Sequence, residues 1–188
     1  MNNHLHHEER GLAADVKQTT SVAAEKCYQC GKCSAGCPVA SEMDLPPSLV
    51  MRMLQTNRPE NDEKLLRSKT IWLCLSCEMC ISRCPMSIDI PKVMDFLRRR
   101  SRDEGKVTDR AKDIVAFHDS FLLSVEKTGK LYELGLIAAY KMKTLHLMQD
   151  VTVAPEMIQK GKLHFIPEMV KNRKNIAQIF KKTIKAKN

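Results

Sequence analysis

The sequence lacks several features on which common protein functions depend. No apolar run approaches the roughly 20 residues that a membrane-spanning helix needs, and the best candidate covers only residues 134–140. There is no Ser-His-Asp set, no glycine-rich phosphate loop and no P-loop or dinucleotide fingerprint. Aromatic residues make up only 5% of the chain, which limits the core to a modest size. These absences predict a soluble chain without direct membrane insertion and without catalytic residues of its own.

The cysteines are concentrated in two short stretches. All eight follow the same spacing, CxxCxxCxxxCP. The first stretch reads Cys27-Tyr-Gln-Cys30-Gly-Lys-Cys33-Ser-Ala-Gly-Cys37-Pro38, and the second reads Cys74-Leu-Ser-Cys77-Glu-Met-Cys80-Ile-Ser-Arg-Cys84-Pro85. This spacing offers three thiolates to one cubane 4Fe-4S cluster and sends the fourth to a neighbouring cluster. The final proline fixes φ and turns the chain away from the cluster.

The two motifs together predict two 4Fe-4S clusters with crossed ligands, because each motif supplies the fourth ligand that the other lacks. The expected ligands of the first cluster are Cys27, Cys30, Cys33 and Cys84. The expected ligands of the second cluster are Cys74, Cys77, Cys80 and Cys37. Oxidised clusters of this kind carry about −2 each, so the formal charge of +9 would fall to about +5.

The two loops differ in glycine content. Gly31 and Gly36 suit a close approach of the first backbone to its cluster. The second motif has no glycine, so the same turns must be made by other residues. These are Ser76, Glu78, Met79 and Ser82.

Two other interpretations of the cysteines compete with this one. Four disulfides would require an oxidising compartment, and no secretory signal is recognised. Structural zinc also uses pairs of cysteines, but zinc sites rarely need three cysteines at CxxCxxC followed by CP, and still more rarely twice. The doubled pattern therefore favours iron-sulfur clusters.

The rest of the chain shows helical periodicity and almost no alternation typical of strands, which predicts an all-α fold. Asp44 is expected to cap a helix that begins at Pro46 and Pro47. Its apolar stripe would be Leu49, Val50, Met53 and Leu54. Further helices are expected from about residue 61 to residue 66 and over residues 91–102 and 131–148. Another is expected from residue 108, where Gly129 suits a C-terminal cap. The apolar positions of that helix are Ala111, Ile114, Val115, His118, Phe121, Leu122 and Val125.

One arginine run and two histidines could indicate either a functional site or ordinary surface residues. The run of Arg98, Arg99, Arg100 and Arg102 is most often a solvated face, although it could meet an acidic partner. His118 and His146 are expected to be packing or surface residues, because no other metal ligands accompany them.

The last 18 residues contain seven cations and no acid. They include one aromatic residue, Phe180, and no nucleic-acid-binding module, so a solvated helix or a protein-docking arm is preferred over nucleic acid. The apolar face of this helix would consist of Ile176, Ile179, Phe180 and Ile184. Such a face is normally buried against something.

The doubled motif, the helical segment between the motifs and the cysteine-free helical region that follows resemble the C subunit of the heterodisulfide reductase family. This family lies within the wider group of α-helical ferredoxin domains. The resemblance implies an electron-transfer subunit of an oxidoreductase complex, with two 4Fe-4S clusters and no catalytic residues. It also implies a cytoplasmic protein complex that acts in methanogenesis.

The resemblance also implies partners, which are the A and B subunits of heterodisulfide reductase. Electrons would pass from the A subunit, which contains flavin and iron-sulfur clusters, to the catalytic B subunit, which reduces a disulfide. A hydrogenase or formate dehydrogenase would deliver electrons through the flavin-containing partner. The CCG repeats that the resemblance assigns to the catalytic partner are absent from this sequence.

The expected organisation has three parts. Residues 1–20, which include His4, His6 and His7, would be a flexible tail. Residues 21–105 would form the α-helical ferredoxin domain, and residues 106–188 a helical C-terminal extension for docking to other subunits. Two alternative functions remain open. One is an iron-sulfur subunit of a lactate, glycerol-3-phosphate or succinate dehydrogenase, and the other is a redox sensor that binds DNA.

Overall fold

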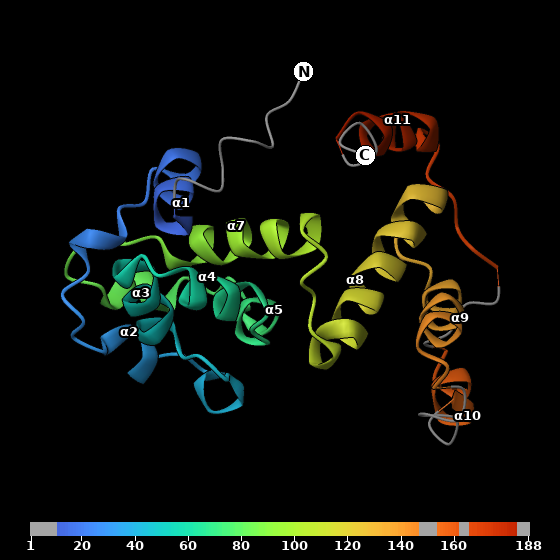
Figure 1. Cartoon of the computed structure of the whole chain (residues 1–188). Coiled ribbons are helices and arrows are strands. Elements are labelled where there is room, and N and C mark those ends of the chain that lie inside the picture. The colour runs from blue at the N-terminus through green and yellow to red at the C-terminus, as the bar shows by residue number, and fades with distance from the viewer. Residues whose placement is uncertain (1–10, 147–153, 162–165, 184–188) are drawn as a thin grey trace. The chain divides into compact units, whose positions relative to one another are not determined.

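The structure is a computed structural model that describes residues 11–146, 154–161 and 166–183. Within these ranges it contains helices and no strand, which confirms the predicted all-α class. The chain divides into two compact units, Met1–Ala111 and Lys112–Asn188 (Figure 1).

The first unit is built from short and medium-length helices. They are α1 (Leu12–Thr20), η1 (Ala24–Lys26), α2 (Lys32–Ala35), η2 (Ala40–Glu42), α3 (Pro47–Thr56), α4 (Pro59–Leu66), α5 (Thr70–Leu73), α6 (Met79–Arg83) and α7 (Ile90–Asp103). The second unit contains most of α8 (Asp109–Thr128), followed by α9 (Glu133–Thr144), α10 (Ala154–Gln159) and α11 (Arg173–Thr183).

The core of the first unit forms around α7, which contacts α1, α4 and α5. Figure 1 shows α7 passing between α1 on one side and α3, α4 and α5 on the other. The largest fully buried apolar side chains are Val16, Val50, Met51, Leu54, Leu65, Ile71, Val93, Met94 and Leu97. This core holds together the helices between which the two cysteine motifs lie.

Residues 12–20 are not part of a flexible tail, and that expectation was wrong for this segment. They form α1, in which Leu12 and Val16 lie one turn apart and are buried against the core. The backbone N–H of Leu12 also donates to Asp62 Oδ2 of α4 at 3.0 Å. A single pair of large apolar residues, one turn apart, makes a pattern too short to recognise. His4, His6 and His7 lie outside the described residues.

Asp44 was predicted to cap α3, and this was also wrong. α3 begins after Pro46 without a side-chain cap. Asp44 instead accepts hydrogen bonds from the backbone N–H groups of Lys69 (2.9 Å) and Thr70 (3.0 Å), at the start of α5. Burial opposes ionisation of this carboxyl, but the hydrogen bonds prevail and lower its pKa. Asp44 therefore ties the chain that leaves the first motif to the helix that leads into the second.

The apolar stripe of α3 was predicted with one error. Val50, Met53 and Leu54 are buried as expected, but Leu49 is 40% exposed. Met51 is fully buried in the core. The helix is therefore rotated relative to the face that the sequence predicted.

The arginine run on α7 is only partly a solvated face. Arg99 and Arg102 are exposed, as expected for that interpretation. The side chains of Arg98 and Arg100 are only 20% and 25% exposed. Arg100 forms ion pairs with Asp15 of α1 and with Glu104. Arg98 and Arg100 therefore serve contacts within the first unit.

In the second unit, α8 ends at the predicted place. Gly129 has φ +88°, and its N–H donates to the carbonyl of Val125 at 2.9 Å. The buried face of α8 was predicted only at Ala111, because the other buried residues are Ser120, Ser124 and Thr128, which carry hydroxyl groups. Phe121 and Leu122, which belong to the predicted apolar stripe, are each 38% exposed.

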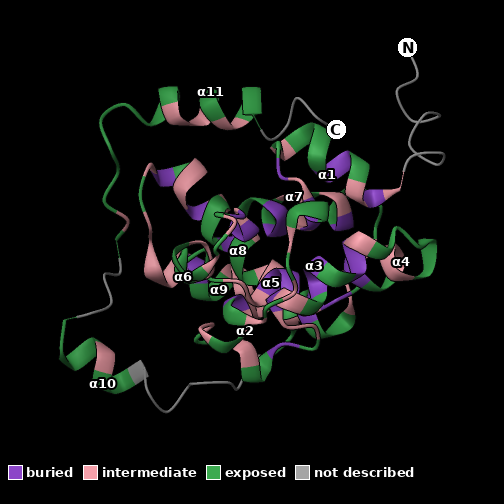
Figure 2. Ribbon diagram, turned by 90° about the vertical axis from the view of Figure 1, so that its left-hand side faces the viewer, coloured by how far each residue is buried: buried purple, intermediate pink, exposed green. Residues whose placement is uncertain are grey.

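Exposed residues dominate the end of the second unit. Figure 2 shows α11 coloured only as exposed and intermediate, and none of its residues is buried. Ile184, the last residue of the predicted apolar face, lies outside the described residues. Among the helices that the structure describes, none combines the length and the apolar character needed to cross a bilayer.

Candidate iron-sulfur centres

One pocket of the first unit gathers the four cysteines predicted for the first cluster. Cys27, Cys30 and Cys33 come from the first motif, and Cys84 comes from the second. The empty space of this pocket, open solvent included, is about 370 Å³. Met86, Ile88 and Ile90 add an apolar wall. The structure therefore brings together soft sulfur donors from both motifs.

A second pocket gathers the other four cysteines. Cys74, Cys77 and Cys80 come from the second motif, and Cys37 comes from the first. The empty space, measured in the same way, is about 380 Å³. Ile90 lines both pockets, so the two sites are neighbours.

The crossing of the last cysteine is explained by two short helices. α2 contains Cys33, α6 contains Cys80, and the two helices contact each other. At their contact, Gly36 faces the side chain of Arg83, and an added Cβ would lie 2.3 Å from Arg83 Cδ. A residue larger than glycine would force Arg83 away. Gly36 thus permits the close approach through which the last cysteine of each motif reaches the opposite pocket.

The two loops use the same backbone conformations with different residues. In the first motif, Gln29 and Gly31 have φ of +57° and +76°. Each residue has a counterpart 47 positions later, Ser76 and Glu78, with φ of +51° and +62°. The loop without glycine therefore makes the turns that the sequence required of Ser76 and Glu78. A left-handed residue other than glycine costs about 1–2 kcal/mol, which the surrounding structure must offset.

The first cysteine of each motif is held by a side chain that the sequence did not reveal. Gln55 of α3 donates from Nε2 to the carbonyls of Ala24 (3.1 Å) and Cys27 (2.8 Å). Arg98 of α7 donates to the carbonyls of Ile71 and Cys74, which are the counterparts of Ala24 and Cys27. Neither residue belongs to the cysteine motif, and only the tertiary contact identifies it.

Burial opposes the ionisation of two of the cysteine thiols. Burial raises the pKa of Cys33. Burial, with a smaller effect from the neighbouring Cys74, raises the pKa of Cys80 to about 11. Both thiols are therefore protonated at neutral pH before a metal binds. Because iron binds the thiolate, cluster assembly must release protons at these positions.

The residues present fit a 4Fe-4S cluster in each pocket. Each site offers four sulfur donors on loops whose backbone is fixed, with an apolar wall beside them. Among the described residues, no three His, Cys, Asp or Glu side chains converge closely enough to hold a single metal ion. His118 and His146 are exposed, and His146 Nε2 lies 3.6 Å from Asp113 Oδ2.

Comparison with known proteins identifies the class that the fold and the pockets indicate. Residues 23–88 match the family model of the 4Fe-4S dicluster domain, and this range contains all eight cysteines. The chain is similar to the C subunit of the ferredoxin:CoB-CoM heterodisulfide reductase of Methanosarcina acetivorans, with 32% identity over 90 residues. That match covers 48% of this chain and 35% of the relative.

Two further relatives define the extent of the similarity. The C subunit of the H(2):CoB-CoM heterodisulfide,ferredoxin reductase of Methanothermobacter marburgensis is 23% identical over 109 residues, 58% of this chain and 57% of its own length. A probable membrane-anchored ferredoxin of Chromohalobacter salexigens is 22% identical over 180 residues, 79% of this chain and 26% of its own length. The predicted resemblance to the C subunit of heterodisulfide reductase is confirmed. The chain nevertheless spans from about a quarter to just over half of these three relatives.

Proposed function

We propose that this chain is an electron-transfer subunit of a heterodisulfide reductase complex in the cytoplasm. It would carry electrons from a flavin-containing partner, the A subunit, to a disulfide-reducing partner, the B subunit. The observation that carries the proposal is the pair of neighbouring pockets, each lined by four cysteines from both motifs. When bound, each 4Fe-4S cluster accepts and releases one electron at a time.

The chain's own residues provide binding, spacing and access. The cysteines hold the clusters, and the contact between α2 and α6 fixes the two sites beside each other. At the same position of each motif lies an exposed apolar residue, Tyr28 (70% exposed) and Leu75 (63% exposed). Cys30 and Cys77, two residues further on, are exposed as well. Each site thus has an accessible edge at which a partner's cofactor can approach.

The native complex provides the direct test of this proposal. We expect anaerobic purification of the tagged chain from its own host to recover a flavoprotein and a protein with CCG repeats. Recovery of a lactate, glycerol-3-phosphate or succinate dehydrogenase instead would replace the proposed complex with the alternative one. Zinc in place of iron in the purified chain would refute both the proposed complex and the dehydrogenase alternative.

Substitutions at the two accessible edges should affect different partners. Tyr28→Ala should weaken the exchange of electrons at the first edge about tenfold, since a buried aromatic residue at an interface is commonly worth more than 1 kcal/mol. Leu75→Ala should weaken exchange at the second edge to a smaller extent. Stopped-flow reduction by the flavin-containing partner and oxidation by the disulfide-reducing partner measure the two steps separately. Tyr28→Phe, which keeps the ring, is the matched control. Equal effects of both substitutions on both steps would contradict the two-edge arrangement.

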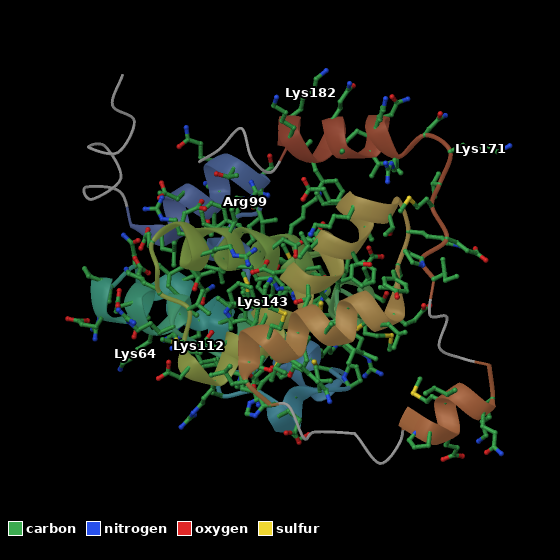
Figure 3. All side chains as sticks on the ribbon, turned by 90° about the vertical axis from the view of Figure 1, so that its right-hand side faces the viewer. Lys64, Arg99, Lys112, Lys143, Lys171 and Lys182 are labelled. Atoms are coloured by element: carbon green, nitrogen blue, oxygen red, sulfur yellow. The ribbon has the colours of Figure 1, made fainter. Side chains whose placement is uncertain are left out.

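The second unit is proposed to anchor the chain to its partners. Residues 112–188 contain 14 Lys and Arg against 7 Asp and Glu, a net charge of +7. The side chains of Lys171 and Lys182 project away from the ribbon (Figure 3). Apolar residues of this unit remain uncovered, among them Met142 (76% exposed) and Ile179 (58% exposed). Basic and apolar surface together suit a protein partner with an acidic rim.

Truncation after Ala111 should separate docking from cluster binding. We expect the shortened chain to keep its iron and its visible absorption, because all eight cysteines lie in the first unit. Binding to the disulfide-reducing partner, measured by interferometry, should weaken at least tenfold. Replacing Lys171, Lys174, Lys181 and Lys182 by Gln should weaken binding in the full chain and reduce its dependence on salt. Full turnover with the truncated chain would rule out this role.

A further inference from the structure

The two cysteine loops are fastened at equivalent carbonyls by side chains of different charge. Gln55 holds the Ala24 and Cys27 carbonyls with a neutral amide. Arg98 holds the Ile71 and Cys74 carbonyls with a guanidinium, which is always positively charged. The same two carbonyls accept hydrogen bonds in both loops, but only the second loop has a positive charge beside it.

The charge of Arg98 is placed where solvent screens it weakly. Its side chain is 20% exposed, and its hydrogen bonds reach the backbone of the second motif's first cysteine. Its ion-pair partner, Asp95, lies 2.7 Å away but is 56% exposed, so water weakens the compensation that Asp95 provides. A partly buried cation beside a cluster stabilises the reduced form, which carries one more negative charge.

Other charged groups near the two pockets are more exposed than Arg98. Glu78 lines the second pocket and Arg83 lies at the contact between α2 and α6, but both side chains are exposed and they are opposite in sign. None of the residues that line the first pocket is charged. The nearest cations in the sequence of the first motif, Lys26 and Lys32, are exposed and therefore screened. Arg98 thus acts on the second pocket without an equally buried counterpart at the first.

We propose that Arg98 makes the cluster at Cys74, Cys77, Cys80 and Cys37 the more easily reduced of the two and so gives the relay a direction. This inference rests on the proposed function. One electron leaves the cluster at the Cys27 loop, which returns to its oxidised state, and enters the cluster at the Cys74 loop, which becomes reduced by one electron. The flavin-containing partner supplies that electron and the disulfide-reducing partner removes it. The Tyr28 edge therefore faces the donor and the Leu75 edge faces the acceptor.

The test is a redox titration of the purified holo-protein, followed by electron paramagnetic resonance. Arg98→Gln should lower the reduction equilibrium constant of one cluster about tenfold, equal to about 59 mV for a one-electron couple. Arg98→Lys, which keeps the charge, should recover most of that shift. Arg99→Gln, which removes an exposed charge from the next residue (labelled in Figure 3), should leave both potentials unchanged.

Two more variants show which cluster Arg98 affects and keep the test valid if Arg98→Gln misfolds. Gln55→Lys should raise the potential of the other cluster, the one that Arg98→Gln leaves alone. Asp95→Asn removes the compensating charge and should raise the potential that Arg98→Gln lowers. Arg98→Gln could lose its clusters. In that case the role of Arg98 is still tested by the other two variants, since Gln55→Lys should raise the reduction potential of one cluster and Asp95→Asn that of the other.

The outcomes separate this inference from the function on which it rests. Unchanged potentials, or equal shifts of both clusters, with full iron content would refute the role of Arg98 and leave the relay intact. A protein that binds no cluster would instead refute the relay.

Discussion

Replacing Cys84 by Ala should destroy the cluster that is otherwise held by the first motif and spare the one held mostly by Cys84's own motif. The unmodified chain should contain about eight iron and eight sulfide, because two cubanes need four of each. Cys84→Ala should retain about half of both. The physical reason is that Cys84 lines the pocket of Cys27, Cys30 and Cys33, away from the three preceding cysteines of its motif.

Cys37→Ala is the matched variant, because it should remove the complementary half. Iron and sulfide analysis gives the amount lost, and electron paramagnetic resonance of the reduced protein shows which signal disappears. If the two variants retain different signals that add up to the spectrum of the unmodified chain, the crossed ligation holds. If each variant damages the cluster of its own motif, the ligands are not crossed and the two pockets have another role.

The grouping of the eight cysteines in two pockets could be predicted from the sequence because the information is local. Ligand spacing within a motif is fixed by the geometry of a cubane, and the doubled pattern requires the exchange of the fourth ligand. The turns of the loops were partly predictable for the same reason. Ser76 and Glu78 had to adopt the conformations that Gln29 and Gly31 adopt, whatever their side chains prefer. The helices between and after the motifs followed from apolar periodicity.

The remaining features depend on pairs of residues far apart in the chain. Asp44 was assigned to the nearest helix start, but it caps a helix that begins 26 residues later at Thr70. Arg98 was placed in a solvated run because its partners, the carbonyls of Ile71 and Cys74, are backbone groups without a sequence signal. In α8 amphipathic periodicity predicted the burial of Ala111 but missed the buried hydroxyl residues Ser120, Ser124 and Thr128, and Phe121 and Leu122 of the predicted stripe are exposed.

Removal of the clusters should unfold much of the first unit and leave the second unit largely as it was. The segments around the cysteines consist of η1, α2, η2, α5 and α6, none of which is longer than five residues. Helices this short are not stable by themselves, because nucleation costs more than one turn of hydrogen bonds returns. In the holo-protein, the metal–sulfur bonds of eight cysteines would hold these segments in place, as metal ligands do in other small domains.

The apolar core divides the first unit into parts that should respond differently. Leu54 of α3 and Val93 and Leu97 of α7 are fully buried in the apolar core and line neither cysteine pocket. These longer helices should therefore lose less structure than the cysteine loops. Hydrogen exchange measured by mass spectrometry, before and after anaerobic chelation of iron, should show the largest loss of protection in residues 24–42 and 70–88. Residues 112–144 contain no predicted cluster ligand and should exchange at the same rate in both states.

Reconstitution with iron and sulfide provides the control, because protection of the loops should return together with the visible absorption. Cys30→Ala and Cys77→Ala, each of which removes one exposed thiol, should each give a partial version of the same result centred on one pocket. Equal helix content and equal loop protection with and without iron would mean that the cysteine loops are held by the packing of α3 and α7 alone. In that case the clusters would bind to sites that are already folded, and the folding of the first unit would not depend on them.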